Sequence, residues 1–236
     1  MHISYLPEAE IGFQILTEDE SKHCVRVLRM QQGDPLLVTN GSGLLFQARI
    51  HDAHPKRCVI ELLSAEKGND HWPYHLHIAI APTKNNDRLE WFLEKATEIG
   101  IDEISLFSAY HSERRTVNPE RLHKLLVSAM KQSIKSRLPI LNQMIDFKRF
   151  VTQKHDGQKY IAWIDDTVKE LLVNDCRNGN NCLIMIGPEG DFSREEVNLA
   201  IDNGFKPISL GNARLRTETA ALVACHTVQL INQMKR

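Results

Sequence analysis

In the first third of the chain, apolar and polar residues alternate along short segments that turn residues separate. The segments cover residues 12–16, 35–40, 43–50 and 57–63. Such alternation is typical of half-buried β-strands, and Asn40-Gly41 between two of the segments is a hairpin signal. Residues 64–70 are polar and lack this pattern. We therefore expect a small β-barrel or sandwich in residues 1–71, with a domain boundary at its end.

From Pro73 onward the pattern changes to strands that alternate with helices. An apolar stripe predicts a helix over 88–99, which Gly100 ends. Asn118 and Pro119 begin a second helix that reaches about residue 136. Two more helices are expected over 193–203 and 217–234, with strands over 74–81, 104–107, 159–164, 182–186 and 207–210. This order predicts an α/β domain with a mostly parallel sheet in residues 72–236.

Two loops near the C-terminus carry the strongest functional signal. The first follows strand 182–186 and ends at Ser193, with Glu196 three residues later, which is a capping box that starts a helix. The second follows strand 207–210 and leads into the helix that begins at Thr217. The carboxyl ends of parallel strands meet at one edge of a sheet, so both loops and both helix N-termini are expected around one crevice. The residues alone thus indicate an α/β enzyme that binds a small ligand.

Composition and absent motifs narrow the class of protein. The five cysteines are scattered without a CxxC pair, which argues against a disulfide framework and a zinc site and suits a reducing cytoplasm. We expect no metal. The chain shows no basic leader followed by an apolar run and no stretch of eighteen apolar residues, so neither export nor a membrane span is expected. The P-loop, the GxSxG elbow and the HExxH helix are all missing.

The charge of the chain is unevenly distributed. The formal net charge is −1, yet residues 110–149 hold nine Lys or Arg against three acids. A local excess of basic residues favours a nucleic-acid partner, although a solvated helix face gives the same pattern.

The two loops together resemble the bacterial 16S rRNA uracil-N3 methyltransferase family (RsmE type) of the SPOUT superfamily. The resemblance rests on Ile186-Gly-Pro-Glu-Gly190 and on Leu210-Gly followed by Leu215-Arg-Thr-Glu-Thr219. Residues 23–34, 87–100, 113–114 and 132–139 are similar to further family stretches, so the resemblance covers nearly the whole chain. It implies a PUA-like β-barrel that binds RNA, followed by a SPOUT methyltransferase domain with a parallel sheet and a C-terminal trefoil knot.

The resemblance also implies an activity and its residues. The expected reaction is transfer of a methyl group from S-adenosylmethionine to N3 of a uridine in the decoding region of 16S rRNA, within the small ribosomal subunit, by a cytoplasmic homodimer. Arg216 and Glu218 are the catalytic candidates, because N3 methylation needs a cation for the uracil anion and help with proton removal; Glu189 is an alternative acid. The expected cofactor residues are Gly187, Glu189, Gly190, Leu210, Gly211, Leu215, Thr219 and Ala220. The expected RNA-binding residues are Arg26, Arg29, Arg114, Gln132, Lys135 and Arg137.

Several positions depart from the family pattern. Asn85-Asn86 stands where one glycine is common, Lys131 where an acid is common, and Ile134 and Asp191 where glycine is usual. Asn212-Ala213-Arg214 replaces a Pro-Arg-aliphatic run. Two other functions stay open: the same fold acting on a tRNA or another rRNA position, and a ribosome-assembly protein that binds RNA without catalysis.

Overall fold

The computed structural model describes residues 2–70 and 72–234, which form two compact units. The first unit contains the described residues up to Asp70 together with Val127–Leu138. The second contains Trp72–Leu126 and the described residues from Pro139 onward. The chain therefore leaves the first unit after Asp70 and returns to it through the end of a long helix.

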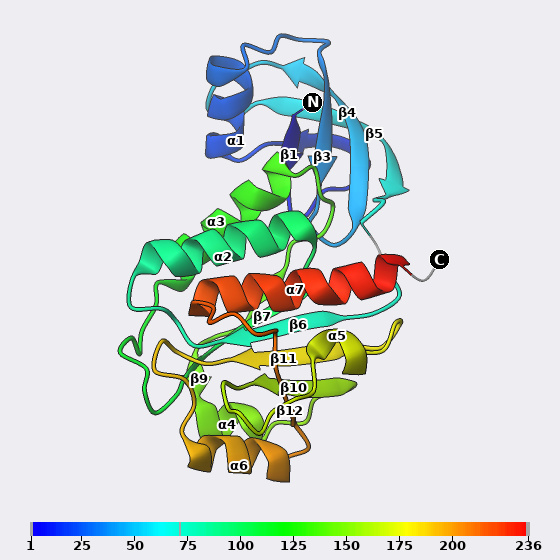
Figure 1. Cartoon of the computed structure of the whole chain (residues 1–236). Helices are drawn as coiled ribbons and strands as arrows, with labels where there is room; N and C mark the ends of the chain where they lie inside the picture. Colours follow the sequence, from blue (N-terminus) through cyan, green and yellow to red (C-terminus); the bar gives the residue numbers. More distant parts are fainter. Residues whose placement is uncertain (1, 71, 235–236) are drawn as a thin grey trace. The chain divides into compact units, whose positions relative to one another are not determined.

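The first unit is built on a five-stranded sheet with the strand order β1-β3-β4-β5-β2 (Figure 1). The strands are β1 (Ile3–Tyr5), β2 (Gly12–Ile15), β3 (Pro35–Thr39), β4 (Leu44–Asp52) and β5 (Val59–Lys67). All pairs are antiparallel except β1 with β3. Side chains such as Val38, Phe46 and Ile60 fill a core on one face of the sheet.

The sequence analysis found four of these strands and misjudged their ends. The predicted strand 57–63 ends too early, because β5 continues into the polar stretch as far as Lys67, which pairs with Leu44. Strand β1 has three residues, too few for a periodic signal. The sequence analysis also missed the helical segment made of α1 (Glu18–Lys22) and the π-helix η1 (His23–Val27), where the Thr17 side chain accepts from the backbone N–H of Glu20.

The long helix α3 (Pro119–Gln132) ends in a Schellman motif, four residues earlier than predicted. The backbone N–H of Lys135 bonds the Met130 carbonyl at 3.0 Å, and that of Ile134 bonds the Lys131 carbonyl at 3.2 Å. The motif requires a left-handed residue, and Ile134 has φ 53°. Glycine is the usual residue at this position because it has no Cβ to strain. Ile134, which departs from the family pattern, is thus a β-branched residue in a backbone conformation that is unfavourable for such residues.

We expect Ile134→Gly to stabilise the protein. A left-handed residue other than glycine costs roughly 1–2 kcal/mol, and the extra freedom of glycine in the unfolded chain offsets part of that gain. The expected net increase in the free energy of unfolding is roughly 0.5–1 kcal/mol, measured by urea denaturation. Ile134→Ala is the matched control, since alanine retains the left-handed strain. Equal effects of the two substitutions would contradict this explanation.

The second unit is built on a sheet whose main path runs β12-β10-β11-β6-β7-β8, with β9 paired to β7. The strands are β6 (Leu76–Ile80), β7 (Glu103–Ser108), β8 (Ile140–Leu141), β9 (Ile145–Asp146), β10 (Gln158–Ala162), β11 (Cys182–Ile186) and β12 (Lys206–Ile208). Every recorded pair in this sheet is parallel, which confirms the predicted α/β fold class. The two-residue strands β8 and β9 were not predicted.

Helices cover both faces of this sheet (Figure 1). One face carries α2 (Asn86–Ile99), α5 (Leu172–Asp175) and α7 (Thr217–Met234), and the other carries α4 (Phe147–Val151) and α6 (Arg194–Asp202). Strand residues on the α4–α6 side, among them Ala79, Ile161 and Met185, share a core with Phe107 and Phe150. The three layers bury β6 and β11 on both faces, which explains their continuous apolar runs.

The chain after β12 runs directly beside the segment that follows β10. The backbone N–H of Ser209 bonds the Glu170 carbonyl at 2.8 Å, and that of Leu172 bonds the Ser209 carbonyl at 3.0 Å. This course is consistent with the trefoil knot, which itself stays a prediction. None of the helices in the part of the chain that the structure describes is long and apolar enough to cross a membrane.

Candidate functional site

Four parallel strands of the second unit end in register. Ile80 of β6 lies opposite Ile186 of β11, Ile186 lies opposite Ala162 of β10, and Ala162 lies opposite Ile208 of β12. The loops that follow these strands therefore leave from one row at the carboxyl edge of the sheet. This is the edge at which open α/β sheets bind ligands, and it carries both of the loops singled out in the sequence.

The loop after β11 is held by side chains that bond its backbone. Ser193 and Glu196 form the predicted capping box of α6, and the same Glu196 carboxylate accepts from the backbone N–H of Tyr110 at 2.8 Å. Asp191 is left-handed, with φ 61°. Its carboxylate accepts from the backbone N–H groups of Phe192 at 2.8 Å and Ile164 at 3.1 Å, and burial raises its pKa. Aspartate tolerates this backbone better than most residues, so Asp191 serves where the family pattern has glycine.

A second set of bonds joins this loop to the loop after β6. Glu189 accepts from the backbone N–H of Lys84 at 2.9 Å. Arg114 donates to the carbonyl oxygens of Thr83 at 3.2 Å and Lys84 at 2.7 Å. A Cβ on Gly190 would lie 2.9 Å from the Cβ of His111. The carboxyl edge is thus a set of mutually bonded loops, in which Gly190 permits a close approach that other residues would prevent.

The loop after β12 is more open. Gly211 has φ 125°, and a Cβ placed on it would meet no atom within 4 Å. Leu210 and Leu215 are half-buried, and Arg216 is exposed at the last position before α7. The backbone N–H of Gly211 bonds Oγ of Ser209 at 3.2 Å, so the loop offers open space beside two half-buried leucines rather than a free donor at the glycine. Apolar surface of this kind is typical of small-molecule sites.

The first turn of α7 contributes a buried acid to the same edge. Glu218 is 7% exposed, and its Oε1 lies 3.8 Å from Nε of Arg88 on α2. Among the described residues, no group hydrogen-bonds its Oε2. Thr219 and Ala220 follow on α7 and are half-buried. A buried carboxylate oxygen without a donor is costly in a folded protein, and is therefore a signal of function.

Comparisons with known proteins agree with this geometry. A family model described as an RNA methyltransferase domain matches residues 70–229, and one described as an RNA methyltransferase PUA domain matches residues 16–63. A Rickettsia conorii protein named ribosomal RNA small subunit methyltransferase E is 31% identical over 222 residues, which cover 92% of this chain and 89% of the relative. The chain belongs to the ribosomal RNA small subunit methyltransferase E family.

Solved structures of similar proteins extend this result. A probable rRNA-methyltransferase from Porphyromonas gingivalis is 41% identical, covers the whole of both chains and superposes with a TM-score of 0.93. A ribosomal RNA small subunit methyltransferase E from Neisseria gonorrhoeae, bound to S-adenosyl methionine, is 26% identical over 98% of each chain, with a TM-score of 0.88. These similarities confirm the resemblance stated from the sequence and the two-part fold of the family.

The predicted cofactor residues fall on two of the loops in the row and on the start of α7. Gly187, Glu189 and Gly190 follow β11, while Leu210, Gly211 and Leu215 follow β12. The structure also adds residues that the sequence reasoning left out. Arg88 contacts Glu218, and His111 donates from Nδ1 to the Asp191 carbonyl at 3.0 Å. Arg88 lay within a stretch that resembles the family, and that was its signal in the sequence.

Five of the six predicted RNA-binding residues belong to the first unit. Arg26 is exposed on η1, and Arg29 is exposed just beyond it with a left-handed backbone. Gln132, Lys135 and Arg137 lie in the returning segment, which an ion pair between Lys131 and Glu20 ties to α1. The ion pair accounts for the departure from the family pattern at Lys131. The sixth residue, Arg114, belongs to the second unit and uses two of its nitrogens on backbone carbonyls.

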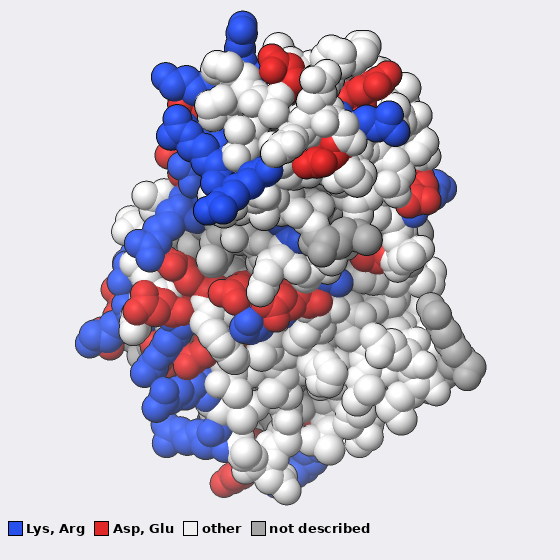
Figure 2. All heavy atoms as spheres, turned by 90° about the horizontal axis from the view of Figure 1, so that it is seen from above, with Lys and Arg blue, Asp and Glu red and all other residues white. Residues whose placement is uncertain are grey.

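Arg137 is half-buried, and its Nε atom is enclosed within the first unit. Its backbone N–H bonds a carboxylate oxygen of Asp70 at 3.0 Å, and its guanidinium lies 3.2 Å from the place where a Cβ on Gly43 would stand. Basic and acidic side chains share the surface shown in Figure 2. The local excess of basic residues in the sequence therefore does not predict by itself which cations are free to meet RNA.

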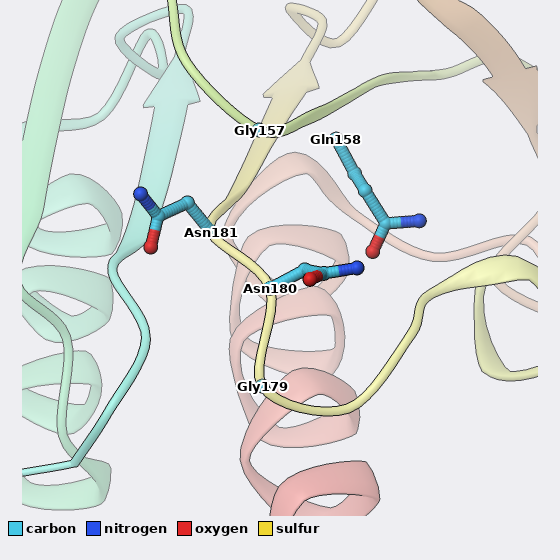
Figure 3. Close-up of a pocket in the computed structure, with 5 residues that line it drawn as sticks. All are labelled: Gly157, Gln158, Gly179, Asn180 and Asn181. Atoms are coloured by element: carbon cyan, nitrogen blue, oxygen red, sulfur yellow. The ribbon is translucent and has the colours of Figure 1, made fainter.

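Two cavities lie at the opposite, amino edge of the sheet. One has a volume of about 460 Å³ and is lined by Gly157, Gln158, Gly179, Asn180 and Asn181, as Figure 3 shows. The other, of about 300 Å³, is lined among others by His75, His77 and Glu103. Both adjoin the first residues of β10 and β11, so neither coincides with the loops at the carboxyl edge. We assign the site from strand polarity and loop chemistry rather than from cavity size.

The amino edge makes the stability of the fold sensitive to acid. Burial lowers the pKa of His77 to about 4, and its Nε2 lies 2.8 Å from Oγ of Ser105. The unfolded chain takes up this proton near pH 6.5, so the folded state loses stability as the pH falls from 6.5 towards 4. We expect the parent to lose about 2 kcal/mol more than His77→Gln between pH 7 and 4.5. Urea unfolding at both pH values measures the free energy of unfolding of each protein. Equal losses of stability in the parent and in His77→Gln would show that His77 is not the source of the acid sensitivity.

Proposed function

We propose that this family member transfers a methyl group from S-adenosylmethionine to N3 of a uridine in the decoding region of 16S rRNA, within the small ribosomal subunit. The observation that carries the proposal is the row of loops at the carboxyl edge, which contains both loops with the family motifs and leads into α7 with Arg216 and Glu218. Family membership supports the class of reaction, and the Neisseria gonorrhoeae relative supports the methyl donor. A cytoplasmic homodimer is the form in which we expect the enzyme to act.

The residues at the carboxyl edge fit S-adenosylmethionine chemically. Leu210, Leu215 and Ala220 offer half-buried apolar surface for the adenine, and Gly211 leaves open space where a side chain would stand. Gly187 and Gly190 let their loop pack closely against Phe192 and His111, which shapes the wall of the proposed site. The Glu189 carboxylate accepts from the backbone N–H of Lys84 in the neighbouring loop, and Thr219 lies in the first turn of α7. When bound, the cofactor supplies an electrophilic methyl group on its sulfonium.

The chain supplies the acid–base chemistry of the substrate. The N3–H of uracil is largely protonated at neutral pH, so methylation needs a group that accepts the proton and a cation that stabilises the resulting anion. We assign the cation to Arg216 and the acceptor to Glu218. Arg26, Arg29, Gln132, Lys135 and Arg137 of the first unit, with Arg114 of the second, are assigned to RNA binding through phosphates, which position a nucleic acid without specifying its sequence.

Mass spectrometry of ribosomal nucleosides tests the proposal. A strain that lacks the gene should lose N3-methyluridine from 16S rRNA, and the purified protein should restore it on small subunits from that strain. Unchanged N3-methyluridine, with loss of a different methylated nucleoside, would identify another target. Intact methylation throughout, with no binding of S-adenosylmethionine in calorimetry, would favour a non-catalytic RNA-binding role.

A further inference from the structure

Glu218 carries a carboxylate oxygen for which the described residues provide no partner. Its side chain is about nine-tenths buried, and Oε2 has no hydrogen-bond donor among the described residues. Leaving such an atom unpaired destabilises a folded protein. The residue stands at the second position of an 18-residue helix, at the edge of the sheet where the two motif loops lie. One oxygen of this buried carboxylate thus has an unused capacity to accept a hydrogen bond.

The other oxygen of Glu218 faces a cation. Oε1 lies 3.8 Å from Nε of Arg88, which is too long for a hydrogen bond and short enough for strong Coulomb attraction. Arg88 is near the start of α2, which packs against α7. The amino end of α7 adds a favourable dipole for a carboxylate. The buried charge is therefore balanced on one side only.

A second acid on α2 is already engaged by another arginine. Glu90, two positions along α2, is engaged by Arg121, with Nε–Oε1 and Nη2–Oε2 distances of 2.7 and 2.9 Å. Asn85 caps α2 by accepting from the backbone N–H of Asp87 at 3.0 Å, which fixes the first turn that carries Arg88. The cap is a role for one of the two asparagines that depart from the family pattern. The position of Arg88 relative to Glu218 is thus set by the start of one helix and by its packing on another.

We infer that Arg88 is a positioning residue that holds Glu218 by Oε1 and leaves Oε2 free to accept the N3 proton of the target uracil. The inference rests on the proposed function. In this step the N3–H bond breaks, and its proton passes to the carboxylate. The electron pair stays on N3 and forms the new bond to the methyl group, while the sulfur keeps the pair of the bond that breaks. Solvent later removes the proton from Glu218.

A double-mutant cycle tests this role. Arg88→Ala should lower kcat about 10–100-fold and leave the KM for small subunits unchanged, and Glu218→Gln should lower kcat at least as much. If Arg88 acts through Glu218, Arg88→Ala should have little further effect in the Glu218→Gln background. Multiplicative effects of the two substitutions, or a loss in Arg88→Ala that appears in KM rather than in kcat, would overturn the inference.

Controls separate this outcome from loss of structure or of the proposed function. Arg88→Lys keeps the charge and should recover part of the turnover. Lys95→Ala breaks two ion pairs elsewhere on α2 and should not reduce turnover. Calorimetry should give the same affinity for S-adenosylmethionine in every variant, and a change of more than about fivefold in Arg88→Lys would contradict a role in positioning alone. If the parent protein leaves N3 of uridine unmethylated, the proposed function fails. If the parent is active and the cycle is additive, only the role of Arg88 fails.

Discussion

Arg216→Ala should abolish most turnover while leaving cofactor binding intact. Arg216 is exposed at the carboxyl edge, directly before α7, and forms no recorded ion pair within residues 2–70 and 72–234. Its proposed task is to stabilise the uracil anion, which exists only as the reaction proceeds. Removal of one such group typically costs about 100–1000-fold in kcat. Single-turnover methylation of small subunits measures the loss, and calorimetry should give an S-adenosylmethionine affinity within about threefold of the parent.

Arg177→Ala is the control for this substitution. Arg177 is an exposed arginine in the loop before β11, at the amino edge of the sheet, and its backbone N–H bonds Gln158 at 2.9 Å. Its replacement removes the same charge from the second unit and should leave turnover unchanged. Full activity of Arg216→Ala would exclude Arg216 from the reaction. A parallel loss of cofactor affinity would instead place it in the cofactor site.

Gly211→Ala should weaken the binding of S-adenosylmethionine about tenfold or more without unfolding the protein. At φ 125° an alanine is strained, although a Cβ would meet no atom within 4 Å. The free loop relieves the strain by changing its backbone, while the ligand requires the original conformation, so the cost of roughly 1–2 kcal/mol appears in binding. Calorimetry measures the affinity, and thermal unfolding should show a small change in Tm.

Gly179→Ala is closely matched to this variant. Gly179 also has a positive φ, 78°, and a Cβ on it would likewise meet nothing within 4 Å. It lines the cavity at the amino edge of the sheet, which is opposite the carboxyl edge that carries the loops with the family motifs. The same backbone strain should therefore leave cofactor affinity unchanged there. Equal weakening in both variants would show that the effect comes from general loosening of the second unit.

The sequence predicted the second unit well because its elements have strong local signals. Gly100, Asn118 and Ser193 mark helix ends that the structure confirms, and β11 occupies the predicted residues 182–186. Helix α3 ends before residue 136 because Ile134 adopts a left-handed conformation, which its β-branched side chain does not signal. Strand β5 extends through polar residues because pairing with β4, rather than burial, holds its end. Neither effect can be predicted from the local pattern of apolar and polar residues.

The sequence predicted where the candidate site lies, but not all of its residues. Each motif follows a strand, and in a parallel sheet all strands point the same way. The sequence therefore placed the glycines, Arg216 and Glu218 at one edge. The contact between Arg88 and Glu218 joins residues 130 positions apart and depends on how α2 packs on α7. The same holds for Lys131 and Glu20, whose pairing depends on the return of the chain to the first unit. Contacts of this kind arise from tertiary packing, which periodicity and composition do not describe.

The return of residues 127–138 to the first unit has a consequence for biosynthesis. Asp70 bonds the backbone N–H groups of Ser136 and Arg137, so residues 2–70 lack part of their hydrogen bonding until the chain has grown past position 137. Domains usually fold in order from the N-terminus during synthesis. Here the N-terminal unit completes its folding only after β6, α2, β7 and most of α3 have emerged from the ribosome. A fragment cut after residue 70 is therefore a poor substitute for the unit, and studies of RNA binding need a chain that reaches residue 138.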